Sequence, residues 1–252
     1  ASFTEGAVAW LTYADRLYQL PLGVVGIAIG IVLLPDISRR LKAGDVGGSR
    51  HALSRATEFA LFLTIPAAAA LMLIPGPLIS VLFERGEFTA ADTAPTALTL
   101  AVYGAGLPAF VMQKVLQPLY FAREDTRTPF RFAVHPMVVN VVLALGLMHW
   151  MGFIAAALGT TLSGWTMTLQ LWWGSRAMGE AAHPDARLLS RVPRILGATL
   201  VMGVVLYLAA RQMAPTLTPT GHRYIGLSLL CLAGFASYML AALALGAVRL
   251  SD

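Results

Sequence analysis

The chain reads Tyr13-Ala14-Asp15-Arg16-Leu17-Tyr18-Gln19-Leu20-Pro21-Leu22-Gly23 at the head of a long apolar run, with an acidic and a basic side chain next to each other. Placing either charge inside a bilayer costs on the order of 3 kcal/mol, so both should face protein or a water-filled cavity. Asp15, Arg16 and Gln19 are spaced three and four residues apart, which puts them on one helical face. We expect that they line a substrate path.

Composition places the chain among polytopic membrane proteins. Hydrophobic residues make up 57% of it and charged residues only 12%, against roughly 25% charged residues in an ordinary soluble domain. The 23 glycines and 14 prolines are tolerated in transmembrane helices, because neighbouring helices and waters satisfy the backbone groups that these residues free. The single cysteine, Cys231, allows no internal disulfide and matches no metal-ligand spacing.

Seven apolar stretches are long enough to cross about 30 Å of hydrocarbon, which takes roughly 20 helical residues. We therefore predict an all-α, polytopic transmembrane helical bundle of about seven spans. The spans cover Ala7 to Leu34, His51 to Ile74, Ala90 to Ala122, Pro129 to Trp150, Phe153 to Trp173, Val192 to Ala210 and Tyr224 to Val248.

Local signals predict where several of these helices begin and end. Pro35 should end the first span, and the polar segment from Asp36 to Arg50 should form a loop. Thr89, followed by Asp92 three residues later, is typical of a capping box at the start of the third span. Only His149 to Gly152 separate the fourth span from the fifth, so these two should form an antiparallel hairpin.

Basic residues are concentrated on one side of the predicted spans. Thirteen fall on that side, and only Arg85, Arg211 and Arg223 fall on the other. The positive-inside rule puts the larger group in the cytoplasm, with the N-terminus of this chain outside and its C-terminus inside. The thirteen are Arg39, Arg40, Lys42, Arg50, Arg55, Arg123, Arg127, Arg131, Arg176, Arg187, Arg191, Arg194 and Arg249.

Other functional classes are poorly represented in the sequence. The basic residues lie in short loops without interleaved aromatic residues, so topology explains them better than nucleic-acid binding does. The chain has no Gly-rich phosphate loop, no Gly-x-Ser-x-Gly elbow and no His-Glu-x-x-His pair, and its five histidines are scattered. We expect a transporter that uses no cofactor and no metal site, and not an enzyme.

A few polar side chains lie inside apolar spans and are candidate functional groups. Lys114 lies nine residues before Arg123, which puts it roughly 13 Å into the membrane at 1.5 Å per residue. Snorkelling towards the headgroups is the alternative account of Lys114, as an interfacial anchor is for Asp15 and Arg16.

Two further polar groups have simpler structural interpretations. Glu58 follows Arg55 by three residues, which favours an ion pair within one helix. Asn140 lies midway along the fourth span, where an interhelical hydrogen bond would contribute about 1 kcal/mol.

Several stretches resemble the MurJ (MviN) family of lipid II flippases, and the resemblance extends over essentially the whole chain. The segments Trp10 to Ala28 and Leu33 to Arg39 resemble that family's eighth transmembrane helix. Leu82 to Ala90 and Lys114 to Pro129 follow in the family's order. The family belongs to the multidrug and oligosaccharidyl-lipid exporter superfamily, whose members have two lobes of six helices, here with two further helices at the end.

The resemblance also implies how the chain is divided. Residues 1–176 would hold five spans of the second lobe, without that lobe's first helix. Residues 177–252 would hold a cytoplasmic loop and the two additional helices. The N-terminal lobe would be missing from this chain and would be one of its partners, together with membrane lipids.

The implied function is translocation of lipid II, the undecaprenyl-pyrophosphate-linked disaccharide pentapeptide, to the outer leaflet of the bacterial cytoplasmic membrane by alternating access. Arg16 falls on the family's cavity arginine and Lys114 on its lysine ahead of a Pro-x-x-Tyr/Phe stretch. Asp15 would hold the Arg16 guanidinium when substrate is absent, and Gln19 stands where some relatives carry glutamate. Arginine suits a pyrophosphate because its fork of N–H donors binds two oxygens at once.

The resemblance also suggests an ion site, because some members bind sodium through an asparagine, an aspartate one turn later and a threonine. Asn140 and Thr160 match two of these ligands, but Ala144 stands where the carboxylate is expected, so a hard cation loses its main charged ligand.

Three alternatives remain open from the sequence. The chain could belong to an exporter of another lipid-linked oligosaccharide or of an amphipathic drug. It could be a membrane enzyme acting on polyprenyl phosphates, although no acids are grouped for that chemistry. It could also be a structural or inhibitory half-protein.

Overall fold

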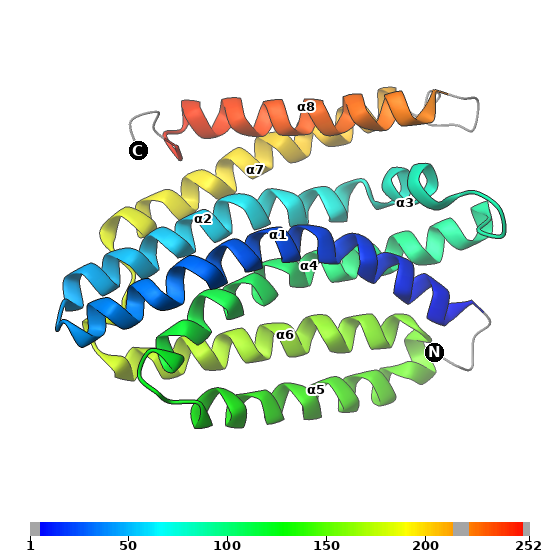
Figure 1. The fold of residues 1–252 in the computed structure, drawn as a ribbon. Helices are drawn as coiled ribbons and strands as arrows, with labels where there is room; N and C mark the ends of the chain where they lie inside the picture. The colour runs from blue at the N-terminus through cyan, green and yellow to red at the C-terminus, as the bar shows by residue number, and fades with distance from the viewer. Residues whose placement is uncertain (1–5, 214–221, 249–252) are drawn as a thin grey trace.

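Residues 6–213 and 222–248 are described by the computed structural model, and within them the chain is helical, with no strand (Figure 1). The all-α prediction is therefore confirmed. The helices are α1 (Ala7–Lys42), α2 (Val46–Leu73), α3 (Pro75–Phe83), α4 (Ala90–Phe121), α5 (Arg127–Met151), α6 (Ile154–Ser175), the short 3-10 helices η1 (Arg176–Met178) and η2 (Glu180–Ala182), α7 (Ala186–Gln212) and α8 (Arg223–Ala244).

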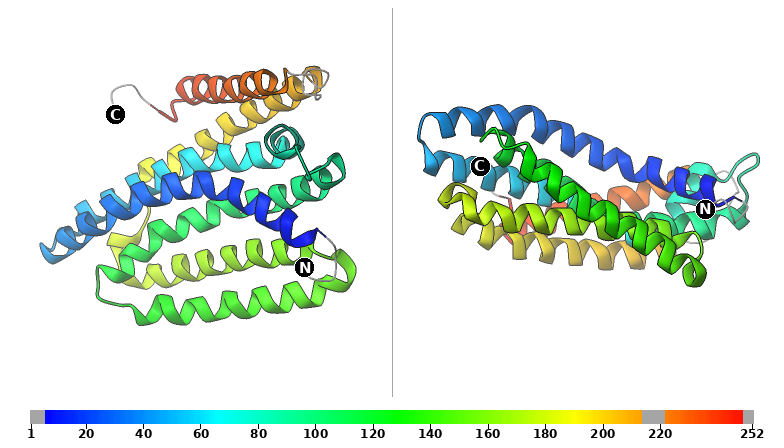
Figure 2. Two further views of the ribbon diagram at one scale, coloured as in Figure 1. Left: turned by 45° about the vertical axis from the view of Figure 1, so that its right-hand side comes forward. Right: turned by 90° about the horizontal axis from the view of Figure 1, so that it is seen from below.

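The long helices lie side by side, with their connections at the two ends of the bundle (Figures 1 and 2). Helices α1, α2 and α4 pack on one another and form the centre. On one flank α6 packs on α4, and α5 packs outside α6. On the other flank α7 packs on α2, and α8 packs on α7. The order of the layers is therefore α5, α6, the central three helices, α7 and α8.

Six of the described helices are long and apolar enough to cross a membrane: α1, α2, α4, α5, α7 with the preceding η2, and α8. The fifth predicted span, Phe153 to Trp173, forms α6, which is not among the six. At 22 residues it is about 33 Å long. Its threonine and serine side chains lower its hydropathy, and it lies between α4 and α5. The chain is a multi-pass membrane protein.

The first helix is longer than predicted, because it continues through Pro35 and ends at Lys42. The prediction that Pro35 ends the helix is wrong. The carboxylate of Asp36 accepts a hydrogen bond of 2.7 Å from Arg39 and one of 2.8 Å from Arg40. These pairs are three and four residues apart and stabilise a helix beyond the apolar segment.

The predicted loop from Asp36 to Arg50 is also much shorter in the structure. A tight turn joins α1 to α2, and Gly44 adopts φ 72° there, a left-handed conformation that favours glycine. Asp45 then caps α2, because its Oδ1 accepts a hydrogen bond of 2.8 Å from the backbone N–H of Gly48. Helix α2 therefore starts at Val46, five residues before the predicted start.

Two other predicted boundaries are confirmed. The Asp92 side chain accepts a hydrogen bond of 2.9 Å from the Thr89 backbone N–H, which completes a capping box at the start of α4. Helices α5 and α6 form the expected hairpin across Gly152, whose φ is 57°. Their backbones approach closely at Gly159, where an added Cβ would lie 3.0 Å from the carbonyl oxygen of Asn140.

Helices α4 and α6 are joined along their length by hydrogen bonds from side chains to backbone carbonyls. Donors come from both helices, and each such bond contributes about 1 kcal/mol net. The bonds are Thr161 to Val102 at 2.9 Å, Trp165 to Ala105 at 3.0 Å, Thr168 to Ala109 at 2.7 Å, Gln113 to Gly164 at 2.9 Å and Tyr120 to Leu171 at 2.6 Å.

Apolar side chains form two separate buried clusters. The larger one joins α1, α2, α4 and α6, and the smaller one joins α7 and α8 to Ile74 and the neighbouring surface of α2. In helix α5, no residue of the most apolar stretch is buried, so this stretch contributes to neither cluster. Such an outward apolar face is what a helix in contact with lipid requires.

Charge is unevenly distributed between the two ends of the bundle. Helix α1 ends, and α2, α5 and α7 begin, at one end (Figure 1). We call it the basic end because all the residues of the larger predicted basic group lie there, except Arg249, which is outside the described residues. Arg85, Arg211 and Arg223 lie at the opposite end.

Candidate functional site

Helices α1 and α4 lie side by side in the same direction, and three contacts define their register. Near the start of both helices, the Trp10 indole N–H donates a hydrogen bond of 2.8 Å to Asp92. Further along, the Tyr18 ring lies 5.6 Å from the Tyr103 ring, measured between centroids. The third contact, nearer the basic end, brings Lys114 to Gly26.

At that contact the stem of Lys114 lies against the surface of α1. A Cβ added at Gly26 would be 3.5 Å from the Lys114 Cγ, so the absence of a side chain at Gly26 leaves the lysine room to pass. Lys114 itself is exposed. Gly30, one turn later, has no neighbour within 4 Å of such a Cβ in the described part of the chain, so close packing there is limited to Gly26.

Arg16 is exposed on α1, ten residues before Gly26. That separation is about 15 Å along the helix and about 80° around it, so Arg16 and Lys114 occupy neighbouring sides of the same helix at two depths. Within residues 6–213 and 222–248, neither cation has a hydrogen-bond or ion-pair partner. Two unpaired cations along apolar helices are the arrangement expected of an anion-binding path.

The partner of Asp15 differs from the one expected. Its carboxylate accepts a hydrogen bond from the Gln19 side chain, and no ion pair joins it to Arg16 in the described residues. The reason is geometric, because residues four apart share a helical face whereas adjacent residues point about 100° apart. Asp15 is half-buried and Gln19 is exposed beside Arg16. This arrangement leaves the guanidinium free.

The predicted interhelical hydrogen bond of Asn140 is confirmed. Its side-chain N–H donates to the Thr160 hydroxyl at 3.2 Å and so joins α5 to α6. Thr160 in turn donates to the Ala156 carbonyl at 3.0 Å. Ala144 lies at the same close crossing, with its Cβ 3.6 Å from the Cβ that Gly159 would carry. An ion site at Asn140 and Thr160 stays a prediction.

A cluster of charges at the basic end joins α2 to α7. The predicted ion pair of Arg55 with Glu58 is confirmed. Glu58 also lies 3.5 Å from the Arg187 Nε and 3.5 Å from an Arg191 Nη, while Arg55 forms a 2.8 Å ion pair with Asp185. Sequence reasoning missed the α7 partners, since they lie about 130 residues away and no local spacing signals them.

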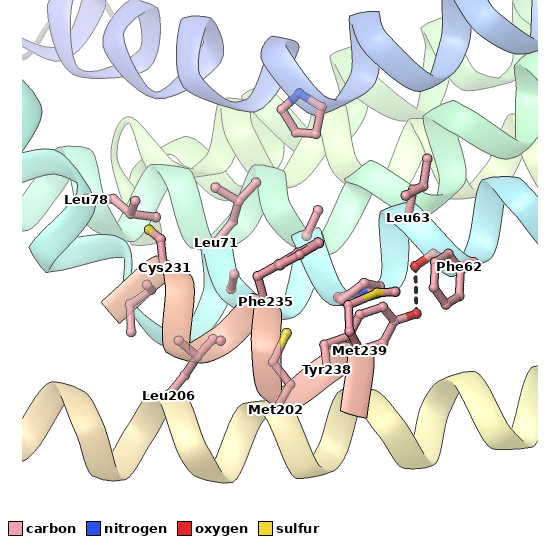
Figure 3. Close-up of a pocket in the computed structure, with 16 residues that line it drawn as sticks. Phe62, Leu63, Leu71, Leu78, Met202, Leu206, Cys231, Phe235, Tyr238 and Met239 are labelled. Carbon is pink, nitrogen blue, oxygen red and sulfur yellow. Dashed lines mark hydrogen bonds between the residues drawn. The ribbon is translucent and has the colours of Figure 1, made fainter. Parts of the chain in front are cut away.

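An apolar cavity of about 350 Å³ lies between α2, α7 and α8 (Figure 3). Leu71, Leu206 and Phe235 contribute to its wall (Figure 3), and Pro21 of α1 also lines it. The Tyr238 hydroxyl satisfies its hydrogen bond on the Phe62 carbonyl at 2.7 Å, so it offers no free polar group to the cavity. The cavity is suited to a hydrocarbon chain.

Comparison with known proteins identifies one family. The profile described as "Lipid II flippase MurJ" matches residues 1–226. A protein of Rhizobium meliloti named "Probable lipid II flippase MurJ" is 43% identical over 100% of this chain and 47% of its own length. One of Vibrio cholerae with the same name is 37% identical over 100% of this chain and 48% of its own length.

A solved structure shows the same fold. The structure titled "Lipid II flippase MurJ, inward closed conformation" superimposes with a TM-score of 0.78 and 27% identity, over 95% of this chain and 47% of that one. The chain thus spans about half the length of the curated relatives it matches.

Proposed function

The chain belongs to the MurJ family of lipid II flippases, and we propose that it forms the second half of a flippase that moves lipid II to the outer leaflet. The observation that carries the proposal is that Arg16 and Lys114 lie on neighbouring sides of α1 and have no hydrogen-bond or ion-pair partner among the described residues, in a chain that matches the family along residues 1–226. The substrate, in this proposal, is the undecaprenyl-pyrophosphate-linked disaccharide pentapeptide.

Arg16 and Lys114 hold the pyrophosphate at two successive depths. Lys114 lies closer to the basic end and binds the headgroup first as a compact point charge. Arg16 lies about 15 Å further along the helix and binds two phosphate oxygens through its planar guanidinium. Asp15 and Gln19 keep the surface next to Arg16 polar without neutralising it. The lobe absent from this chain supplies the opposite wall of the path.

The division of the chain and its orientation are part of the same proposal. Residues 1–176 form five spans of the second lobe, without its first helix, and residues 177–252 form a cytoplasmic loop followed by two additional helices. The separate apolar cluster of α7 and α8 supports this division. The basic end faces the cytoplasm of a bacterial inner membrane, which the positive-inside rule supports, so the N-terminus of this chain is outside.

The polyprenyl tail stays in hydrocarbon while the headgroup crosses. The apolar cavity between α2, α7 and α8 supports this part of the proposal, because its walls can bury methyl-branched chain outside the polar path (Figure 3). The two lobes then rock about the path, which opens first inward and then outward.

An Arg16→Ala substitution in the complete protein tests the proposal. We expect it to fail to support growth of flippase-depleted cells and to abolish exposure of lipid II on the outer surface. Arg211→Ala, at the far end of α7, is the matched control and should retain both. Normal growth and export with Arg16→Ala would overturn the proposed role of Arg16. Export of a different lipid-linked sugar or of a cationic drug in its place would overturn the substrate.

A further inference from the structure

A second groove runs between α1 and α2 towards the basic end of the bundle. It has a volume of about 520 Å³ and is separate from the side of α1 that carries Arg16 and from the cavity of Figure 3. Its walls are apolar, with Ala28 and Val32 on α1 facing Phe59 on α2. Polar side chains close one end, which is lined by Asp36, Arg40, His51 and Arg55.

The depth of the groove corresponds to one leaflet of a membrane. From Ala28 to Arg40 the α1 wall is about 18 Å long at 1.5 Å per residue. Half of a hydrocarbon core of about 30 Å is about 15 Å. A phospholipid acyl chain spans one leaflet, whereas an undecaprenyl chain is much longer than this groove. Val32 and Phe59 are also substantially exposed, at 68% and 48%, so the groove needs an apolar occupant.

The polar end of the groove carries an excess of positive charge. Between residues 36 and 58 the sequence has five basic residues and three acidic ones. Arg40 is held by Asp36 at 2.8 Å and lies 3.5 Å from Asp45, so its guanidinium is fixed beside the groove. Arg55 also lines the groove, and its guanidinium is held by Glu58 and, at 2.8 Å, by Asp185. A phosphate oxygen can accept further charge-assisted hydrogen bonds from guanidinium groups fixed in this way.

We propose that this groove binds an anionic glycerophospholipid of the leaflet at the basic end. One acyl chain lies between Val32 and Phe59, and the phosphate contacts Arg40 and Arg55 where the apolar wall ends. At a membrane surface, each arginine or lysine of a basic cluster raises the affinity for anionic lipids about fivefold. The lipid joins α1 to α2 beyond their own contacts and stays bound there without being transported. This inference does not rest on what the protein translocates.

Binding of phosphatidylglycerol, compared with phosphatidylcholine of the same acyl chains, tests the proposal. We measure it on the complete purified protein by native mass spectrometry and by lipid-dependent shift of the unfolding temperature. Wild-type protein should bind phosphatidylglycerol at least fivefold more tightly than phosphatidylcholine. Arg40→Gln should lower this ratio of affinities about fivefold. Arg39→Gln is the matched control, because Arg39 pairs with the same Asp36 but is 78% exposed and does not line the groove.

A second variant tests the apolar part. Ala28→Trp fills the groove from the exposed side of α1 and should weaken the binding of both lipids, while leaving Arg40 in place. Equal affinity for the two lipids, an equal loss with Arg39→Gln, or unchanged binding with Ala28→Trp would each overturn the proposal. Free glycerol phosphate, which lacks the chains, should not bind measurably, and tight binding of it would also contradict a lipid site.

Discussion

Lys114 of α4 crosses α1 at Gly26, where an added Cβ would lie 3.5 Å from the lysine Cγ. This contact fixes where the Lys114 side chain of α4 emerges beside α1, the helix that carries Arg16. The site therefore depends on a glycine as well as on the two charges.

The first prediction concerns the size of residue 26. Gly26→Ala should retain transport, because its Cβ makes an ordinary van der Waals contact with Lys114. Gly26→Leu should reduce export as strongly as Lys114→Met does, since the larger side chain displaces the lysine stem. Lipid II exposure in flippase-depleted cells measures both, with membrane-inserted protein quantified in parallel. Equal export by the alanine and leucine variants would show that the lysine does not depend on this contact.

The second prediction concerns the crossing of α5 and α6. Gly159→Ala should destabilise the protein by about 1 to 3 kcal/mol, because the new Cβ would lie 3.0 Å from the Asn140 carbonyl oxygen, and backbone cannot yield easily. Gly146→Ala is the control within the same hairpin. Its Cβ meets nothing within 4 Å of described atoms, so it should be neutral or slightly stabilising. Unfolding in detergent with added denaturant compares the two variants, and equal stabilities would contradict the close crossing.

The third prediction concerns the hydrogen bonds between α4 and α6. Tyr120→Phe removes a buried hydroxyl that donates to the Leu171 carbonyl at 2.6 Å, and should cost about 1 kcal/mol. Thr166→Val is a matched control because, in the part of the chain that the structure describes, the Thr166 hydroxyl bonds only within its own helix, to the Leu162 carbonyl. The thermal unfolding midpoint should fall by a few degrees for the first variant and stay within error for the second. A larger fall for Thr166→Val would contradict the importance of the interhelical bonds.

The fourth prediction concerns the ion pairs that attach α7 to α2. Glu58→Met leaves Arg55, Arg187 and Arg191 without their shared carboxylate and should cost about 3 kcal/mol, since Glu58 is only 13% exposed at its side chain. The double variant Glu58→Met with Arg55→Met should lose less than the sum of the two single variants, because Arg55 and Glu58 interact directly. Urea unfolding of the purified protein measures all three variants. A loss in the double variant equal to that sum would argue against an ionic interaction between the two side chains.

Local patterns in the sequence were sufficient for much of the fold. The apolar stretches, the capping box of Thr89 with Asp92 and the short link at Gly152 each depend on residues within a few positions, and each is confirmed. The break predicted at Pro35 is wrong, because a proline is tolerated inside a transmembrane helix, where neighbouring groups satisfy the backbone that it frees. The pairs of Asp36 with Arg39 and Arg40 add a few tenths of a kcal/mol each on the following turn.

The sequence by itself determined the class of the protein, since apolar length and the distribution of basic residues depend on composition along the chain. It also indicated Arg16 and Lys114, because isolated charges in apolar helices are visible without any structure. Only the tertiary structure decided that Asp15 bonds to Gln19, that Arg16 has no partner among residues 6–213 and 222–248, and that Lys114 emerges at Gly26. It likewise decided that Glu58 gathers arginines from α7. These relationships depend on side-chain direction and helix register. Both are set only when the helices pack and bring together residues up to about 130 positions apart in the sequence.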